Sequence, residues 1–343
     1  MLKERTKIRK TLNYLIRAAI ILVTYGFIYR QVLHQRKPQE ILHAIDSILV
    51  QRETWLMLGL LVLLMFVNWG LESFKWQLLI GKIEKVSFFK AYRAVLTGVS
   101  ISLFTPNRTG DYLGRVFILD KGSHVDGILV TIVGSIAQFM VTLCIGLFCL
   151  LSFFDQYLAV SFRLHHYLLA GLILLVPVIV FFLLLFYFKI GILADIIGRY
   201  FPGKWEKIAR HIGVFGRFSS MELLWVLLIS LARYVIFSSQ FLILLRISGA
   251  AVPPAQGFIL IPVIFLVMAI VPSIALADLG IRGSVSLYIL GLYFTTFASG
   301  VPVPEIAILA ASTALWLINL ILPAILGTLF VFNLKFFRNN KLL

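Results

Sequence analysis

Apolar positions along this chain form long uninterrupted runs. A helix needs about 20 apolar residues to cross about 30 Å of hydrocarbon. Six runs reach that length and predict full membrane-spanning helices, at about residues 12–32, 54–72, 127–153, 167–188, 222–245 and 305–332. The pattern therefore predicts an all-α polytopic membrane protein, with residues 1–343 forming a single integral membrane domain.

Two further apolar regions, about residues 91–119 and 256–297, are interrupted by proline, glycine and charged residues. The first holds only about 29 residues, enough for two half-crossings but too few for two full ones. We expect it to form a re-entrant helical hairpin. The second is long enough for either a deep hairpin or two crossings, and both interpretations stay open.

The distribution of lysine and arginine favours this topology. With a cytoplasmic N-terminus and a re-entrant region 91–119, the basic segments 75–93, 189–217 and 335–341 all lie on the cytoplasmic side, as the positive-inside rule requires. A single crossing at 91–119 would place the later basic segments outside. We therefore expect cytoplasmic N- and C-termini, in a bacterial inner (cytoplasmic) membrane.

The composition agrees with a membrane protein and limits the kinds of molecule that it is expected to bind. Apolar residues make up 60% of the chain and charged residues 13%, and the formal net charge is +16. Such an excess suits contact with anionic lipid headgroups, and the basic and bulky apolar segment 199–218 is typical of a helix on the inner leaflet. The basic residues are scattered and do not form a basic soluble domain, which argues against nucleic acid as a binding partner. No cofactor or metal is expected.

The two broken regions contain similar cores, "FTPNRTGDYLGR" and "IVPSIALADLGIRG". In each, a proline precedes an aspartate and an arginine that are four residues apart: Pro106, Asp111 and Arg115 in the first, Pro272, Asp278 and Arg282 in the second. On the predicted topology the two regions enter from opposite faces, as in transporters built from inverted repeats. We expect an inverted repeat of residues 54–188 and 222–333, with the two breaks close together.

Both breaks carry chemistry that suits an anion. A half-helix that begins after a break directs unpaired N–H groups toward it, and arginine presents forked donors that match a phosphate. The predicted substrate-binding residues are Asn107, Arg108, Thr109, Asp111, Arg115, Asp278 and Arg282. For the two aspartates the alternative is an ion pair with the arginine four residues later, which would only hold each hairpin together.

Other polar residues in the spans give weaker signals. Glu72 lies beside Lys75, and an interfacial pair between them is the favoured interpretation. Asn68, Arg233 and Asn319 either line a polar cavity or form hydrogen bonds between helices. No catalytic motif occurs, so we expect that the protein is not an enzyme. A membrane-embedded transferase that uses Asp111, Asp278 or Glu72 is the alternative.

The two cores and the hydropathy pattern resemble the flippase-like transmembrane domain of lysylphosphatidylglycerol synthases, which also occurs alone in the YbhN-type family. In the fused proteins of that family a separate soluble domain makes the lipid, and we expect this protein to work without such a domain of its own. Many relatives carry a second motif closer to P-x-x-x-G-G-x-G-x-R-E. This chain has Asp278 before Gly280 and Gly283 after Arg282, with no glutamate there.

The resemblance implies a lipid flippase that moves a phospholipid or lipid-linked headgroup between leaflets. The expected substrate is an anionic or aminoacylated phospholipid or another lipid-linked molecule, made by a separate lipid-synthesising enzyme. A non-transporting scaffold for such an enzyme is a further alternative. Whether the protein forms a homo-oligomer stays open.

Overall fold

The computed structural model describes residues 52–103, 105, 108–120, 124–158, 165–191, 213–271, 275–298 and 302–331. Within these ranges the protein is all-α and contains no strand. This confirms the predicted fold class. The predicted first span, residues 12–32, lies outside the described residues, as does most of the basic segment 199–218.

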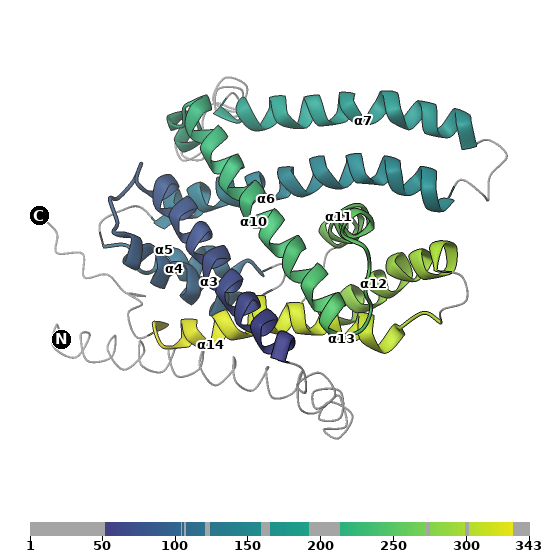
Figure 1. The fold of residues 1–343 in the computed structure, drawn as a ribbon. Coiled ribbons are helices and arrows are strands. Elements are labelled where there is room, and N and C mark those ends of the chain that lie inside the picture. The colour runs from purple at the N-terminus through teal and green to yellow at the C-terminus, as the bar shows by residue number, and fades with distance from the viewer. Residues whose placement is uncertain are drawn as a thin grey trace, which may run out of the picture.

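Five of the predicted membrane-spanning runs form helices that are long and apolar enough to cross a bilayer. They are α3 (Arg52–Ile80), α6 (His124–Phe153) with its continuation η3 (Phe154–Leu158), α7 (His165–Phe188), α10 (Ser220–Ile247), and a last span built from α13 (Glu305–Trp316), η6 (Leu317–Ile321) and α14 (Leu322–Thr328). Figure 1 shows α7 packed alongside α6 and α10 crossing α3. Wide faces of α7 remain exposed and apolar, as expected for contact with lipid.

Helix α3 extends further than the apolar pattern predicts. The run of apolar residues ends at about residue 72, but the helix continues to Ile80. Glu72 and Lys75 are 6% and 1% exposed, so the helix face that carries these two charges lies inside the protein. The charged residues do not end the helix because they find partners in the interior.

The first broken region forms a helical hairpin of α4 (Phe88–Ser102) and α5 (Gly110–Val116). The helices approach closely where Gly98 faces Gly114: a Cβ added to Gly114 would lie 2.6 Å from the Gly98 Cα. At its open end the backbone N–H of Asp120 donates to both Glu84 oxygens, at 3.2 and 3.0 Å. Lys90 donates to the same two residues. The chain therefore enters and leaves this hairpin at one place.

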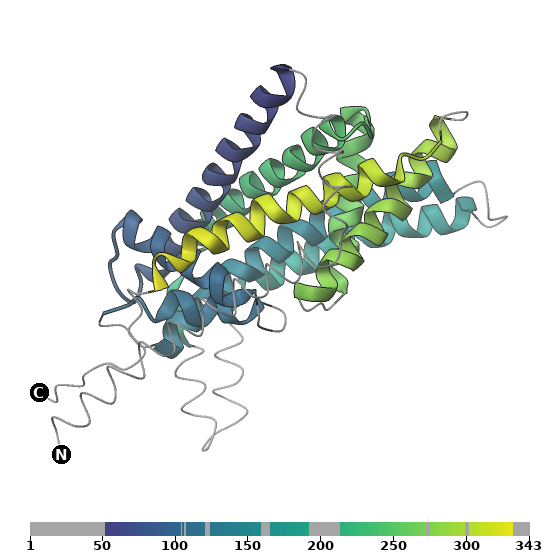
Figure 2. The same cartoon turned by 90° about the horizontal axis from the view of Figure 1, so that it is seen from below.

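The second broken region forms α11 (Pro254–Ile270) and α12 (Ala275–Phe297), which pack against each other. The two hairpins contact opposite halves of the last span, because α4 packs on α14 and α12 packs on α13. Figure 1 shows α4 and α5 near α14, and α12 near α13; Figure 2 shows the last span running between these ends. Between the two halves, the turn η6 is a π-helix, a feature that often occurs at functional sites.

Candidate functional site

A cavity of about 590 Å³ lies between the two hairpins. Three arginines line it: Arg108 from the break between α4 and α5, Arg233 from α10, and Arg282 from α12. The two predicted arginines that lie in different broken regions thus share one cavity, as expected for two breaks that come together.

The backbone of the first break is fixed in an uncommon conformation. Arg108 has a φ of 57°, the left-handed region that a non-glycine residue adopts at a cost of about 1–2 kcal/mol. The Thr105 hydroxyl accepts a hydrogen bond from the Gly110 N–H at 2.8 Å, and the Thr105 carbonyl accepts one from the Arg108 N–H at 3.2 Å. These bonds hold the turn that places Arg108 at the cavity. Thr105 was not among the predicted site residues.

Two other predicted residues at this break have different outcomes. Thr109 is exposed, precedes α5 without a side-chain capping bond, and does not belong to the cavity lining. Asn107 lies outside the described residues. A substrate contact by either residue stays a prediction.

Asp111 and Arg115 form the ion pair that the four-residue spacing allows. Arg115 donates from Nε to Asp111 Oδ1 at 2.8 Å and from Nη2 to Oδ2 at 2.5 Å. Its Nη1 donates to Glu72 Oε1 at 2.7 Å, and the residue is 5% exposed. Because this guanidinium spans α5 and α3 and does not line the cavity, its geometry matches the alternative of an internal bridge. A direct role in substrate binding stays untested.

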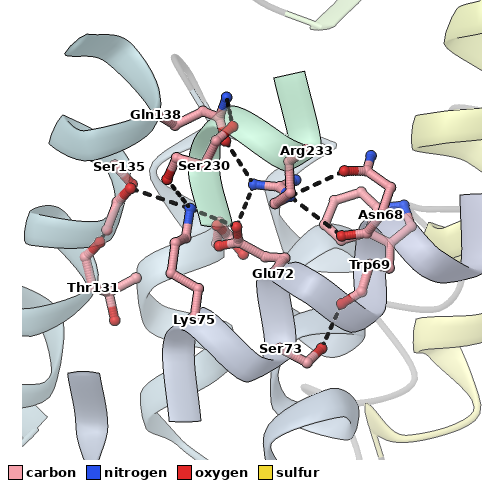
Figure 3. A network of polar contacts seen from close by, with 12 residues as sticks. Asn68, Trp69, Glu72, Ser73, Lys75, Thr131, Ser135, Gln138, Ser230 and Arg233 are labelled. Carbon is pink, nitrogen blue, oxygen red and sulfur yellow. Dashed lines mark hydrogen bonds and ion pairs between the residues drawn. The ribbon is translucent and has the colours of Figure 1, made fainter. Parts of the chain in front are cut away.

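Glu72 is the centre of a larger network that the sequence did not reveal. Its carboxylate accepts from Arg115. It also accepts from Lys75 at 2.7 Å and from the Arg233 guanidinium at very short range (Figure 3). The Lys75 ammonium also donates to the Gly134 carbonyl at 3.2 Å and the Ser230 hydroxyl at 3.4 Å. The simple pair with Lys75 that the spacing predicts therefore exists, but it is one part of a buried cluster that joins α3, α5, α6 and α10.

Arg233 connects this network to the cavity. Its Nε donates to Asn68 Oδ1 at 3.0 Å and its Nη1 to Gln138 Oε1 at 3.1 Å, while its guanidinium lies 5.7 Å from the Trp69 ring centre. Figure 3 shows these side chains converging on Arg233 from α3 and α6. The guanidinium is therefore held in one orientation, with its charge at the cavity wall.

The cavity lining contains both polar and apolar side chains. Asn68 and Asn319, which were predicted either to line a cavity or to bond between helices, do both: each lines the cavity, and Asn68 Nδ2 donates to Asn319 Oδ1 at 3.5 Å. The lining also includes aromatic and aliphatic side chains, among them Phe237, Phe265 and Met268. Such a site can hold a charged group and a hydrocarbon segment at the same time.

Asp278 lies on α12, one helical turn before Arg282, but its side chain is outside the described part of the structure. Its predicted role stays a prediction. No group of three or more histidine, cysteine, aspartate or glutamate residues that could hold a metal ion occurs within the described ranges.

Comparison with known proteins identifies the family. A family model described as the lysylphosphatidylglycerol synthase TM region matches residues 14–327. A search of curated proteins and a search of solved structures found no match. The family match covers both hairpins, the Glu72 network and the three arginines of the cavity. Because this match extends over most of the length of the chain, the chain belongs to the lysylphosphatidylglycerol synthase TM region family.

Proposed function

We propose that the protein is a flippase-like transporter that moves a phospholipid or lipid-linked headgroup between leaflets through the arginine-lined cavity. The observation that carries this proposal is the shared cavity of Arg108 and Arg282, which come from the two broken hairpins. Charged groups inside a membrane protein are costly unless they are paired or serve a polar path. Three guanidinium groups at one cavity fit the transfer of a phosphate group.

The arrangement of the hairpins supports a path through the membrane. The contacts between Asp120, Glu84 and Lys90 bring together the two ends of the α4–α5 hairpin, which suits a re-entrant element. The α11–α12 pair packs on the other half of the last span. In this proposal the two elements enter from opposite faces of an inner membrane, and the termini are cytoplasmic. The headgroup passes between the breaks while the lipid tails remain in the bilayer.

The residues have distinct proposed roles. Arg108, Arg233 and Arg282 hold the phosphate, since all three line the cavity. Asp111 and Arg115 act indirectly: their bridge to Glu72 connects the first hairpin to α3, and Glu72 in turn orients Arg233. Asp278 would tune Arg282 or contact an amine of the substrate.

A liposome assay tests the proposal. The full-length protein is reconstituted into vesicles that contain fluorescent phosphatidylglycerol, and a membrane-impermeant quencher reports the fraction of lipid in the outer leaflet. We expect the wild-type protein to give access to inner-leaflet lipid and the Arg108→Ala/Arg282→Ala double variant to lose most of that activity. Arg246→Ala is the matched control, because Arg246 is exposed at the end of α10 and away from the cavity lining.

Stability and product analysis separate this function from its alternatives. Thermal unfolding of the purified double variant must match the wild type, so that lost activity is not lost folding. Unchanged flipping by a folded double variant would contradict the proposal. Mass spectrometry of the lipids after the assay addresses a transferase, since an enzyme would produce a chemically new lipid. A scaffold would give neither transport nor product.

A further inference from the structure

We infer that the π-turn η6 (Leu317–Ile321) in the last span is a hinge that changes the shape of the cavity. Around this hinge, α12 and α13 move as one unit relative to α4, α5 and α14. The inference rests on the proposed function and specifies the conformational change by which a headgroup enters the cavity and leaves it.

The backbone of the last span is least regular at this turn. The Leu322 N–H donates to the Leu317 carbonyl, five residues back, so the four-residue pattern of the α-helix is interrupted. Pro323 follows directly and has no N–H to donate to the Asn319 carbonyl. Sharp bends in helices occur at π-turns and at prolines. A change of angle at this place therefore disturbs the fewest helical hydrogen bonds.

The apolar core of the last span divides at the same place. Buried residues of α13 as far as Leu315 pack in one cluster with α10, α11 and α12. Buried residues from Trp316 to Ala324 pack in a second cluster with the end of α4. The partly buried Ile318 contacts the first cluster, and Leu279 of α12 contacts the second. The two clusters thus meet at the turn, and each half of the span has its own packing partners.

The half of the span after the turn is tied to the first hairpin. The Ser100 hydroxyl of α4 donates to the Ala324 carbonyl of α14 at 2.6 Å. A Cβ added to Gly327 would overlap the Leu96 carbonyl oxygen, so the backbones of α14 and α4 are in direct contact. Neither helix can shift along the other without breaking this contact. We therefore treat α4 and α14 as parts of one unit.

The half before the turn is held by apolar packing. Helix α13 packs on α12 and on α10. Among the residues that the structure describes, no hydrogen bond or ion pair joins α13 to α10, and the Thr313 hydroxyl donates within its own helix, to Leu309. Packed helices with apolar contacts can slide by small steps, as in shear movements. Helix α13 can thus move along α10 together with α12.

Movement at the turn acts directly on the cavity. Trp316, Asn319 and Leu320 line it, together with Arg108 from the first break and Arg282 from α12. The two arginines belong to different units, because Arg108 precedes α5 and Arg282 lies within α12. A bend at η6 therefore changes the separation of these arginines and the shape of the wall between them.

Polar groups at the turn are not fully satisfied in this conformation. Ser312 Oγ and Trp316 Nε1 are buried and have no hydrogen-bond partner in the described part of the chain. Asn319 Oδ1 accepts from Asn68 at 3.5 Å, the upper limit for a hydrogen bond. A buried polar group without a partner costs about 1–3 kcal/mol. A second arrangement of the helices that supplies partners therefore lies close in free energy.

Distances between spin labels test the hinge in the full-length protein. After Cys144→Ser and Cys149→Ser, labels are placed at the exposed positions Leu113 of α5 and Tyr288 of α12, on the two sides of the hinge. The control pair is Tyr288 with Ile306 of α13, which is also exposed and lies in the same unit. Double electron–electron resonance should give two distances that differ by several ångström for the first pair. It should give one narrow distance for the control pair.

Two variants connect this movement to the turn. A π-turn holds one residue more than an α-helix, so deletion of Ile318 should restore an α-helix without rotating the flanking halves. We expect unchanged or higher thermal stability, a single distance for the first pair, and flipping at least about tenfold slower. Pro323→Ala, which restores an N–H to the helix, should act in the same direction with a smaller effect.

A second deletion is the matched control. Removal of Ala310, within the regular part of α13, rotates the preceding residues by about 100° and should lower the midpoint of thermal unfolding. If deletion of Ile318 lowers it equally, the flanking halves were not in α-helical register and the interpretation of the turn is wrong.

The outcomes separate the hinge from the proposed function. A single narrow distance for the Leu113 and Tyr288 pair in the wild-type protein overturns the hinge, whatever the flipping assay shows. Wild-type flipping by a variant that has only one distance overturns the connection between the hinge and transport. The proposed function fails separately, if two distances are present but vesicles show no flipping of fluorescent phosphatidylglycerol.

Discussion

The Arg115 guanidinium donates to Glu72 Oε1 at 2.7 Å and so connects the short helix α5 to the interior of α3. The same guanidinium holds Asp111 through two bonds. Glu72 uses its second oxygen for Lys75 and Arg233. One carboxylate therefore determines both the position of the first hairpin and the orientation of an arginine at the cavity.

Replacement of Glu72 by glutamine should destabilise the protein strongly. The variant leaves Lys75, Arg115 and Arg233 with Asp111 as their remaining described acidic partner, and an uncompensated buried charge costs about 3–5 kcal/mol. We expect a clear decrease in the midpoint of thermal unfolding in detergent, measured by tryptophan fluorescence.

A second substitution tests the electrostatic cause. Adding Lys75→Met removes one of the unpaired cations, so the double variant should recover part of the lost stability. Additive destabilisation would show that the effect of Glu72→Gln comes from altered packing and not from the charge.

Gly114→Ala should separate α4 from α5. The added methyl group would lie 2.6 Å from the Gly98 Cα and 2.9 Å from the Gly98 backbone nitrogen, and neither atom can move without its helix. We expect a loss of about 1–3 kcal/mol in the free energy of unfolding, together with reduced flipping.

Gly70→Ala is the matched control for this substitution. Gly70 lies in the middle of α3, and an added Cβ there meets no atom within 4 Å. Alanine has the better helix propensity by about 1 kcal/mol, so this variant should be neutral or slightly more stable. Equal effects of the two substitutions would contradict the importance of the close helix contact.

The spans could be predicted from sequence because length and apolarity are local properties. Residues 127–153 and 222–245 are enough by themselves to require a crossing helix, and α6 and α10 occupy them. The pairing of Asp111 with Arg115 is also local, since a four-residue spacing places both on one helix face. The sequence left two interpretations of Asp111 open, an ion pair with Arg115 and a contact with a substrate, because the spacing alone does not distinguish them.

The Glu72 network could not be predicted in the same way. Glu72 contacts Arg115 on α5 and Arg233 on α10, and no short-range pattern connects these three positions. The available signal was general: charged residues inside spans require partners, and Arg233 has no acid within one helical turn of it. Only the similarity of the two broken cores allowed the prediction that Arg108 and Arg282 lie close together.

Arg233→Lys should reduce flipping with a smaller effect on stability. Lysine retains the charge beside Glu72, but it lacks the planar fork that bonds Asn68 and Gln138 together. We expect a decrease of about tenfold in the flipping rate, which corresponds to an increase of about 1.4 kcal/mol in the activation free energy. Arg246→Lys is the control on the same helix. Wild-type flipping by Arg233→Lys would indicate that the charge alone is sufficient.

The proposal that the α4–α5 hairpin is re-entrant predicts which residues share a membrane face. After Cys144→Ser and Cys149→Ser, single cysteines are introduced at Lys85 before α4, at Val125 after α5, and at Arg246 near the end of α10, all of which are exposed. A membrane-impermeant maleimide applied to right-side-out or inverted vesicles then reports the face of each.

The expected labelling follows from the contacts of the chain. Because Asp120 bonds Glu84 at the open end of the hairpin, positions 85 and 125 should react in the same vesicle orientation. Helix α10 begins near Lys82, which pairs with Glu222 at 2.6 Å, and ends 25 residues beyond Glu222 at Ile247. Position 246 should therefore react only in the opposite orientation. Labelling of positions 85 and 125 from different faces would mean that residues 91–119 cross the membrane completely, and the paired entry of the two hairpins would have to be abandoned.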